Sequence, residues 1–288
     1  MSEIVLIDKD YVLLPKLLKM LDRSWLKVFT FFGVWAVIWL PIALAISKAS
    51  GQKLGKTLIP KQKLILLASL YFLSPIVLTW KIKVENISFE SLGLSLQPII
   101  LVHILLGLFV GLGSLIIIFA IESAFNLVSW HWERKQQLVS LLLPILLLSL
   151  FISVVEESIF RGYVLNTLAD DYSYGIAAII SSIVFALLHL IWERKETLPQ
   201  IPGLWLMGMI LVAAKAIDRS SLGLAIGLHA SWIWGLTCID SAQLLTYKNK
   251  DSWLTGLNQQ PLAGIAGISC LVVTGLVLWL TANSSLLI

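Results

Sequence analysis

The stretch that decides the fold runs from Leu138 to Leu165 and reads LVSLLLPILLLSLFISVVEESIFRGYVL. Its first part, 138–155, is almost entirely apolar and is long enough to cross about 30 Å of hydrocarbon as a helix. The apolar residues are continuous and do not alternate with polar ones, so a helix is favoured over a barrel strand. The stretch therefore predicts a transmembrane helix whose last turns carry charged residues.

The rest of the chain repeats this pattern. Of its 288 residues, 58% are hydrophobic and only 13% are charged, which is too apolar for an ordinary soluble domain. We expect spans near 28–47, 64–80, 99–121, 138–155, 175–192, 203–217, 221–239 and 262–283. The sequence thus predicts an all-α, polytopic transmembrane bundle of about eight helices in an integral, multi-pass membrane protein.

Residues 1–27 interleave lysines and an arginine with leucines, which predicts an amphipathic helix at the membrane interface. The sequence then divides into lead-in transmembrane helices over 28–135, a core over 136–240, and a polar loop with a C-terminal transmembrane helix over 241–288. The span near 203–217 is the weakest, because Lys215 lies within it. The net charge of +4 suits contact with anionic lipid headgroups. No cluster of basic and aromatic residues indicates nucleic-acid binding.

Ionisable side chains at membrane depth are costly and therefore indicate function. Glu157 and Arg161 are four residues apart, so they share a helical face and can pair. Glu156 points about 100° away from Glu157, which leaves it available for acid–base chemistry. The alternative interpretation is a structural ion network at a helix end.

Two histidines in later apolar runs complete a constellation. His189 ends the run SSIVFALLHLIW, with Phe185 four residues earlier, and His229 lies in LGLAIGLHASWIWGL. A glutamate pair and two deep histidines on three helices are the groups needed to hold and activate a water molecule at a peptide carbonyl.

The series Glu156-Glu157-x-x-x-Arg161, Phe185-x-x-x-His189 and His229 resembles the three motifs of the CAAX prenyl endopeptidase and bacteriocin-processing family, also called the abortive-infection family. The resemblance implies an intramembrane endopeptidase that acts on a membrane-associated protein or peptide. It implies that Glu156 is the general base and that His189 holds or polarises the water.

By the same resemblance, Glu157 supports and orients the catalytic groups, Arg161 neutralises Glu157, and His229 stabilises the oxyanion. One position departs from the family pattern, because Ile233 stands where the third motif commonly has an asparagine. Isoleucine donates no hydrogen bond, so another group must complete the oxyanion hole. Trp232 and Trp234 are the neighbouring donors, although tryptophan in a membrane helix is more often an interfacial anchor.

The sequence leaves open whether the site uses a metal ion. Glu156, His189 and His229 could supply three ligands to Zn²⁺, but the HExxH pattern of soluble zinc proteases is absent. We favour a metal-free glutamate mechanism. We expect the remaining ionisable residues His103 and Glu122 to face the interface or a loop, and Asp218 and Arg219 to form a plain polar turn.

Two alternatives to the peptidase come from other classes. A catalytically impaired relative would act as a membrane scaffold or partner-binding protein, and Ile233 favours that interpretation. A secondary transporter would use the buried acids as a proton relay, but the inverted repeat typical of such proteins is not visible.

Overall fold

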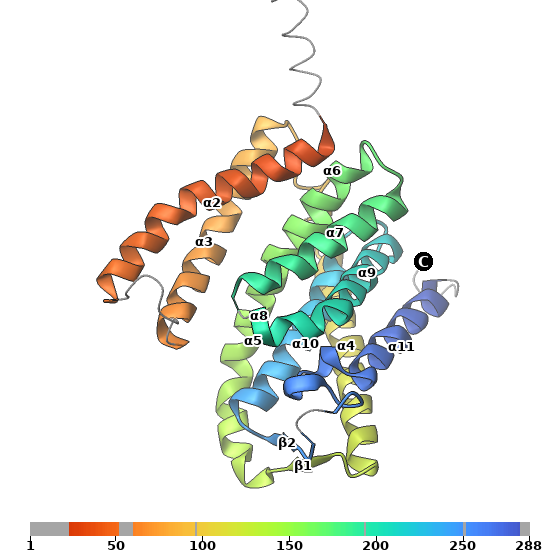
Figure 1. Ribbon diagram of the computed structural model, residues 1–288. Helices are drawn as coiled ribbons and strands as arrows, with labels where there is room; N and C mark the ends of the chain where they lie inside the picture. Colours follow the sequence, from red (N-terminus) through yellow and green to blue (C-terminus); the bar gives the residue numbers. More distant parts are fainter. Residues whose placement is uncertain (1–22, 52–59, 96, 193, 250–251, 283–288) are drawn as a thin grey trace, which may run out of the picture.

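The structure is a computed structural model that describes residues 23–51, 60–95, 97–192, 194–249 and 252–282. In this described part, the chain forms an all-α bundle with one small two-stranded sheet (Figure 1). The interfacial helix predicted over 1–27 lies almost entirely outside the described residues. The helices are α2 Ser24–Ala49, α3 Pro60–Val84, α4 Ile99–Ala124, α5 Lys135–Glu157, α6 Leu165–Ala169, α7 Tyr174–Leu188, α8 Arg194–Thr197, α9 Ile201–Ile217, α10 Gly223–Ser241 and α11 Ile265–Ala282.

Shorter elements connect these helices. The strands β1 (Val128–Trp130) and β2 (Leu245–Tyr247) pair antiparallel, with Ser129 opposite Thr246. Five 3₁₀ turns lie at helix ends or in loops: η1 Trp132–Arg134, η3 His189–Ile191, η4 Leu198–Gln200, η5 Leu257–Gln259 and η6 Pro261–Ala263. The β1–β2 pair closes the end of the bundle opposite to the turn between α6 and α7 (Figure 1).

Seven helical segments in the described part of the chain are long and apolar enough to cross a membrane: 24–49, 61–84, 99–124, 132–169, 174–191, 194–217 and 265–282. The predicted polytopic bundle is therefore confirmed. The weak span near 203–217 forms most of α9, and α9 is the second part of the longer segment 194–217. The predicted span at 221–239 forms α10 but is not among the seven, because His229 and other polar residues dilute its apolar character.

Helix α10 is the most enclosed helix of the bundle. Every residue from Leu222 to Trp232 is buried, and α10 packs most extensively against α4 and α5. Backbone meets backbone where α10 crosses α4, because a Cβ atom added to Gly227 would lie 2.1 Å from the carbonyl oxygen of Ile104. The interior of the bundle thus holds a helix that need not face lipid.

The helix that begins with α5 changes geometry at its functional end. Residues Ser158–Val164 form a π-helix (η2) that joins α5 to α6. Side chains from neighbouring helices bond its carbonyls: Ser181 Oγ donates to Phe160 O at 2.8 Å, and Lys215 Nζ donates to Arg161 O at 2.7 Å. Such π segments are rare and occur frequently at functional sites.

Helices α2 and α3 form a pair that leans away from the other helices (Figure 1). The indole of Trp39 on α2 donates to Ser69 Oγ on α3 at 3.0 Å. At the start of α2, the backbone N–H of Ser24 donates to Asp171 in the α6–α7 turn at 2.9 Å, and this bond lowers the pKa of Asp171. This bond fixes the α2–α3 pair to the α6–α7 turn, at the end of the helical segment 132–169.

Candidate active site

The two adjacent glutamates occupy the last turn of α5, immediately before the π-helix. Glu157 is fully buried and Glu156 is 7% exposed. Arg161 pairs with Glu157 as predicted, with 3.0 Å between Nη1 and Oε1 and no exposure of either side chain. The cost of burying the Glu157 carboxylate is therefore offset by a charge of opposite sign on the same helical face.

The Arg161 guanidinium is also held from two other directions. Its Nη2 atom donates to the carbonyl oxygen of Gly208 on α9 at 3.3 Å, and its central carbon lies 4.4 Å from the centroid of the Phe185 ring. A cation over an aromatic face is attracted by the ring quadrupole. Arg161 thus connects the end of α5 to α7 and α9.

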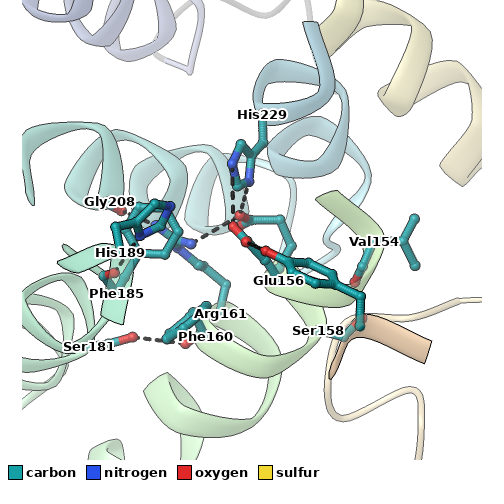
Figure 2. A network of polar contacts seen from close by, with 12 residues as sticks. Val154, Glu156, Ser158, Phe160, Arg161, Ser181, Phe185, His189, Gly208 and His229 are labelled. Carbon is teal, nitrogen blue, oxygen red and sulfur yellow. Dashed lines mark hydrogen bonds and ion pairs between the residues drawn. The ribbon is translucent and has the colours of Figure 1, made fainter. Parts of the chain in front are cut away.

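His229 on α10 bridges the two carboxylates (Figure 2). Its Nδ1 atom is 2.7 Å from Glu157 Oε1, and its Nε2 atom is 3.6 Å from Glu156 Oε2. Since a carboxylate only accepts hydrogen bonds, the contact with Glu157 places a proton on Nδ1. The imidazole is oriented by Glu157 and presents Nε2 to Glu156.

His189 follows the last residue of α7 and is partly exposed. Its Nδ1 atom lies 2.8 Å from the carbonyl oxygen of Phe185, which places the proton on Nδ1 and leaves Nε2 as the acceptor in the neutral ring. The Phe185 ring lies 4.7 Å from the His189 ring and 5.8 Å from the His229 ring, measured between centroids. The predicted residues from three helices therefore meet around Phe185.

Tyr71 on α3 is a part of the site that the sequence did not indicate. Its hydroxyl donates a hydrogen bond to Oε1 of Glu156. The available signal was a hydroxyl-bearing aromatic residue in the middle of the apolar run LILLASLYFLSPIV. Tyrosine in such a run is also common as a plain interfacial residue, so the signal alone was weak.

Glu156 and His189 face a common cavity of about 320 Å³. Aromatic and aliphatic side chains from α2, α3, α5 and α7 form most of its wall: Phe32, Trp35, Ala36, Trp39, Leu70, Tyr71, Val155, Ile159, Phe160, Leu188, Ile191 and Trp192. The cavity thus offers an apolar environment with a carboxylate and an imidazole on its wall. This combination is typical of a binding site for a largely apolar ligand.

Comparison with known families gives one match. A family model described as type II CAAX prenyl endopeptidase, Rce1-like, matches residues 138–235. Over these residues the chain is similar to this family. Searches of curated proteins and of solved structures found no match. The Rce1-like core contains all five predicted site residues, whereas Tyr71 and the α2–α3 pair lie outside it.

The oxyanion donors suggested by the sequence are engaged elsewhere. Trp232 Nε1 donates to Ser114 Oγ on α4 at 3.1 Å, and Trp234 Nε1 donates to Leu142 O on α5 at 2.8 Å. Both indoles therefore bind α10 to its neighbours. At the Rce1-like site, His229 is the side chain of α10 that contacts the carboxylates.

The described residues do not form a metal-ligand group: no three His, Cys, Asp or Glu side chains among them are arranged to hold a metal ion. His229 and His189 both have Nδ1 engaged with a protein oxygen, which leaves Nε2 open in each ring. Glu156, His189 and His229, the three residues considered for Zn²⁺, do not converge as such a group.

Of the two ionisable residues expected to face the interface or a loop, Glu122 is placed differently, whereas His103 faces the turn after α9. Glu122 does not face the interface or a loop: it is 3% exposed at the end of α4, beside Tyr247 and Cys270. His103 forms an ion pair with Asp218, which is 8% exposed. The turn after α9 is therefore more than a plain polar turn, because its carboxylate is buried against α4.

Proposed function

We propose that the chain is an intramembrane endopeptidase that cleaves a peptide bond of a membrane-associated protein or peptide. The observation that carries the proposal is that Glu156 and His189 line one apolar cavity, while His229 lies 3.6 Å from Glu156. All three residues fall in the segment that matches the Rce1-like family model. A carboxylate and an imidazole on one cavity wall are suited to activating a water molecule.

In the proposed reaction, Glu156 is the general base. It takes a proton from water while the water oxygen attacks the carbonyl carbon of the scissile bond, and a tetrahedral intermediate forms. The same proton then passes from Glu156 to the amide nitrogen as the C–N bond breaks. His189 Nε2 accepts a hydrogen bond from the attacking water and orients it.

His229 is the proposed oxyanion donor. A proton on Nε2 would convert its ring to imidazolium, and the Glu157 carboxylate bonded to Nδ1 would stabilise that charge. Arg161 in turn pairs with Glu157 and fixes its position. Glu157 and Arg161 therefore act as positioning residues that do not touch the substrate. One preorganised donor of this kind contributes about 2.7–4 kcal/mol in proteases.

We propose that this chemistry proceeds without a metal. The described residues support this proposal, because no three His, Cys, Asp or Glu side chains among them converge as a ligand set. A chelator such as EDTA, added during purification and assay, should leave the cleavage rate unchanged. Loss of cleavage with EDTA, restored by Zn²⁺, would contradict a metal-free mechanism.

The test of the peptidase uses the full chain in liposomes with a library of membrane-anchored peptides, and products are identified by mass spectrometry. We expect cleavage by the native chain and at least a hundredfold loss in Glu156→Gln and His189→Ala, since general acid–base groups contribute about 10²–10⁴-fold. Glu133→Gln, an exposed residue of η1, is the control. Equal cleavage by all four proteins would remove the proposal.

Ile233 supports a second candidate, a catalytically impaired relative that binds membrane partners. The family asparagine is missing, and the nearby indoles bond to Ser114 and Leu142. Ile233→Asn separates the two candidates. A gain of cleavage in this variant, from a native chain without activity, would favour the impaired relative.

A further inference from the structure

A second cavity, of about 420 Å³, lies at the end of the bundle where α4 and α10 begin and α9 ends. None of its residues belongs to the candidate active site. Its wall contains both polar and apolar residues. The polar ones are Ser95, Gln97, His103, Asp218, Arg219 and Ser221. The apolar ones are Ile99, Ile100, Leu106, Ile217 and Leu224.

An ion pair between half-buried His103 and buried Asp218 fixes one side of this cavity. His103 Nδ1 contacts one oxygen of Asp218, and the other oxygen accepts a hydrogen bond from the backbone N–H of Leu224 at 2.9 Å. The Asp218 carboxylate is therefore satisfied within the protein, and its charge is compensated whenever His103 is protonated. The Nε2 atom of His103 remains as a polar group of the cavity wall.

Two further donors at the cavity lack partners. Among the described residues, neither the Arg219 guanidinium nor the Gln97 side-chain amide has a hydrogen-bond or ion-pair partner. Together with His103 Nε2, which donates only when the ring is protonated on both nitrogens, they give the cavity three groups that can bind one anionic ligand. A guanidinium in particular matches the oxygens of a phosphate or carboxylate.

The loop that carries Arg219 is strained. Arg219 and Ser220 both have positive φ angles, 49° and 70°, which non-glycine residues rarely adopt. The N–H of Ser220 donates to Lys215 O at 3.0 Å, and the N–H of Leu222 donates to Gly93 O at 2.9 Å. Strain of this kind is concentrated at ligand sites. Here it places Arg219 at the edge of the cavity.

We propose that this cavity binds an anionic phospholipid. Arg219, Gln97 and His103 would donate to the phosphate oxygens, and the apolar wall would take the glycerol and the start of an acyl chain. The place of the cavity at the ends of three helices agrees with the depth of lipid headgroups in a bilayer. Inorganic phosphate offers the same oxygens but has nothing to occupy the apolar wall.

The test is native mass spectrometry of the full chain in detergent, titrated with phosphatidylglycerol or phosphatidylcholine. We expect a tightly bound phosphatidylglycerol and about tenfold weaker binding in Arg219→Gln, the loss of one charge-assisted hydrogen bond. Arg194→Gln is the matched control, because Arg194 is exposed and precedes the opposite end of α9. This variant should bind phosphatidylglycerol as the native chain does.

Three results would overturn the proposal. These are equal binding of the two lipids, equal affinity of Arg219→Gln and the native chain, and binding of inorganic phosphate as tight as that of phosphatidylglycerol. The last result would assign the site to free phosphate. None of these measurements depends on peptide cleavage, so the result is independent of the proposed peptidase.

Discussion

At the scale of single residues, Tyr71 joins the lead-in helices to the chemistry of the core. Its hydroxyl donates to Glu156 from α3, outside the segment 138–235. The bond holds one carboxylate oxygen, while His229 lies near the other. Two neighbours thus restrict the proposed base to one orientation on the cavity wall.

Replacing Tyr71 by phenylalanine keeps the ring in the wall and removes this bond. We expect cleavage to fall about ten- to a hundredfold, because a hydrogen bond to a charged group contributes about 1.5–3 kcal/mol, with little change in thermal stability. Cleavage rates in liposomes and unfolding temperatures in detergent provide the check. Tyr174→Phe, at an exposed tyrosine of α7, is the control, and an equal effect of both variants would argue against a role for Tyr71.

Local contacts of the site could be predicted from the sequence, and distant ones could not. The pairing of Glu157 with Arg161 follows from helical spacing alone, and the structure confirms it. The bond from Tyr71 depends on how α3 packs beside α5, which no spacing reveals. The same holds for the contact of His103 with Asp218, which are far apart in the sequence.

At the scale of elements, glycines set how closely α4 and α10 approach. A Cβ atom on Gly107 would lie 2.4 Å from Leu224 O, and one on Gly227 would lie 2.1 Å from Ile104 O. Small residues at such crossings let helix backbones touch in membrane proteins. The crossing is two residues from His229, so it also determines how deep this imidazole sits.

The substitution Gly227→Ala should destabilise the bundle by about 1–3 kcal/mol, because the added methyl group forces the two backbones apart. Gly113→Ala is the matched control, since nothing lies within 4 Å of a Cβ atom at that position of α4. The control should be neutral or slightly stabilising, because alanine is the better helix former. Unfolding in detergent measures both variants, and similar stability of the two would contradict the close crossing.

Helix positions were largely predictable because apolar runs identify spans directly, as for α4, expected over 99–121 and observed at Ile99–Ala124. The π-helix Ser158–Val164 was not predictable, because its residues SIFRGYV carry no special signal. Nor did composition show which helix lies inside: His229 indicated a functional position, but the enclosure of α10 follows from packing.

At the scale of the whole molecule, one helical segment sets the two ends of the bundle. It runs over 38 residues, from Trp132 to Ala169, or about 55 Å at the rise of a helix. This exceeds the hydrocarbon thickness of about 30 Å. The β1–β2 strand pair and the α6–α7 turn must therefore lie on opposite sides of the membrane.

Cysteine labelling tests this topology. Glu133→Cys and Asp170→Cys place a thiol at exposed positions near the two ends of the segment. In sealed vesicles of one orientation, a membrane-impermeant maleimide should label only one of these variants until the vesicles are opened. The native chain, whose cysteines are buried or half-buried, gives the background. Labelling of both variants from the same side would contradict the arrangement.

The enclosure of α10 has a consequence for biosynthesis. A translocon releases a segment into lipid according to its own hydrophobicity, and α10 is less apolar than the seven segments that qualify as spans. Its main packing partners, α4 and α5, precede it in the chain. We therefore expect the ribosome to deliver these helices first, so that α10 enters the bilayer by docking against them and the histidine it carries is never left alone among acyl chains.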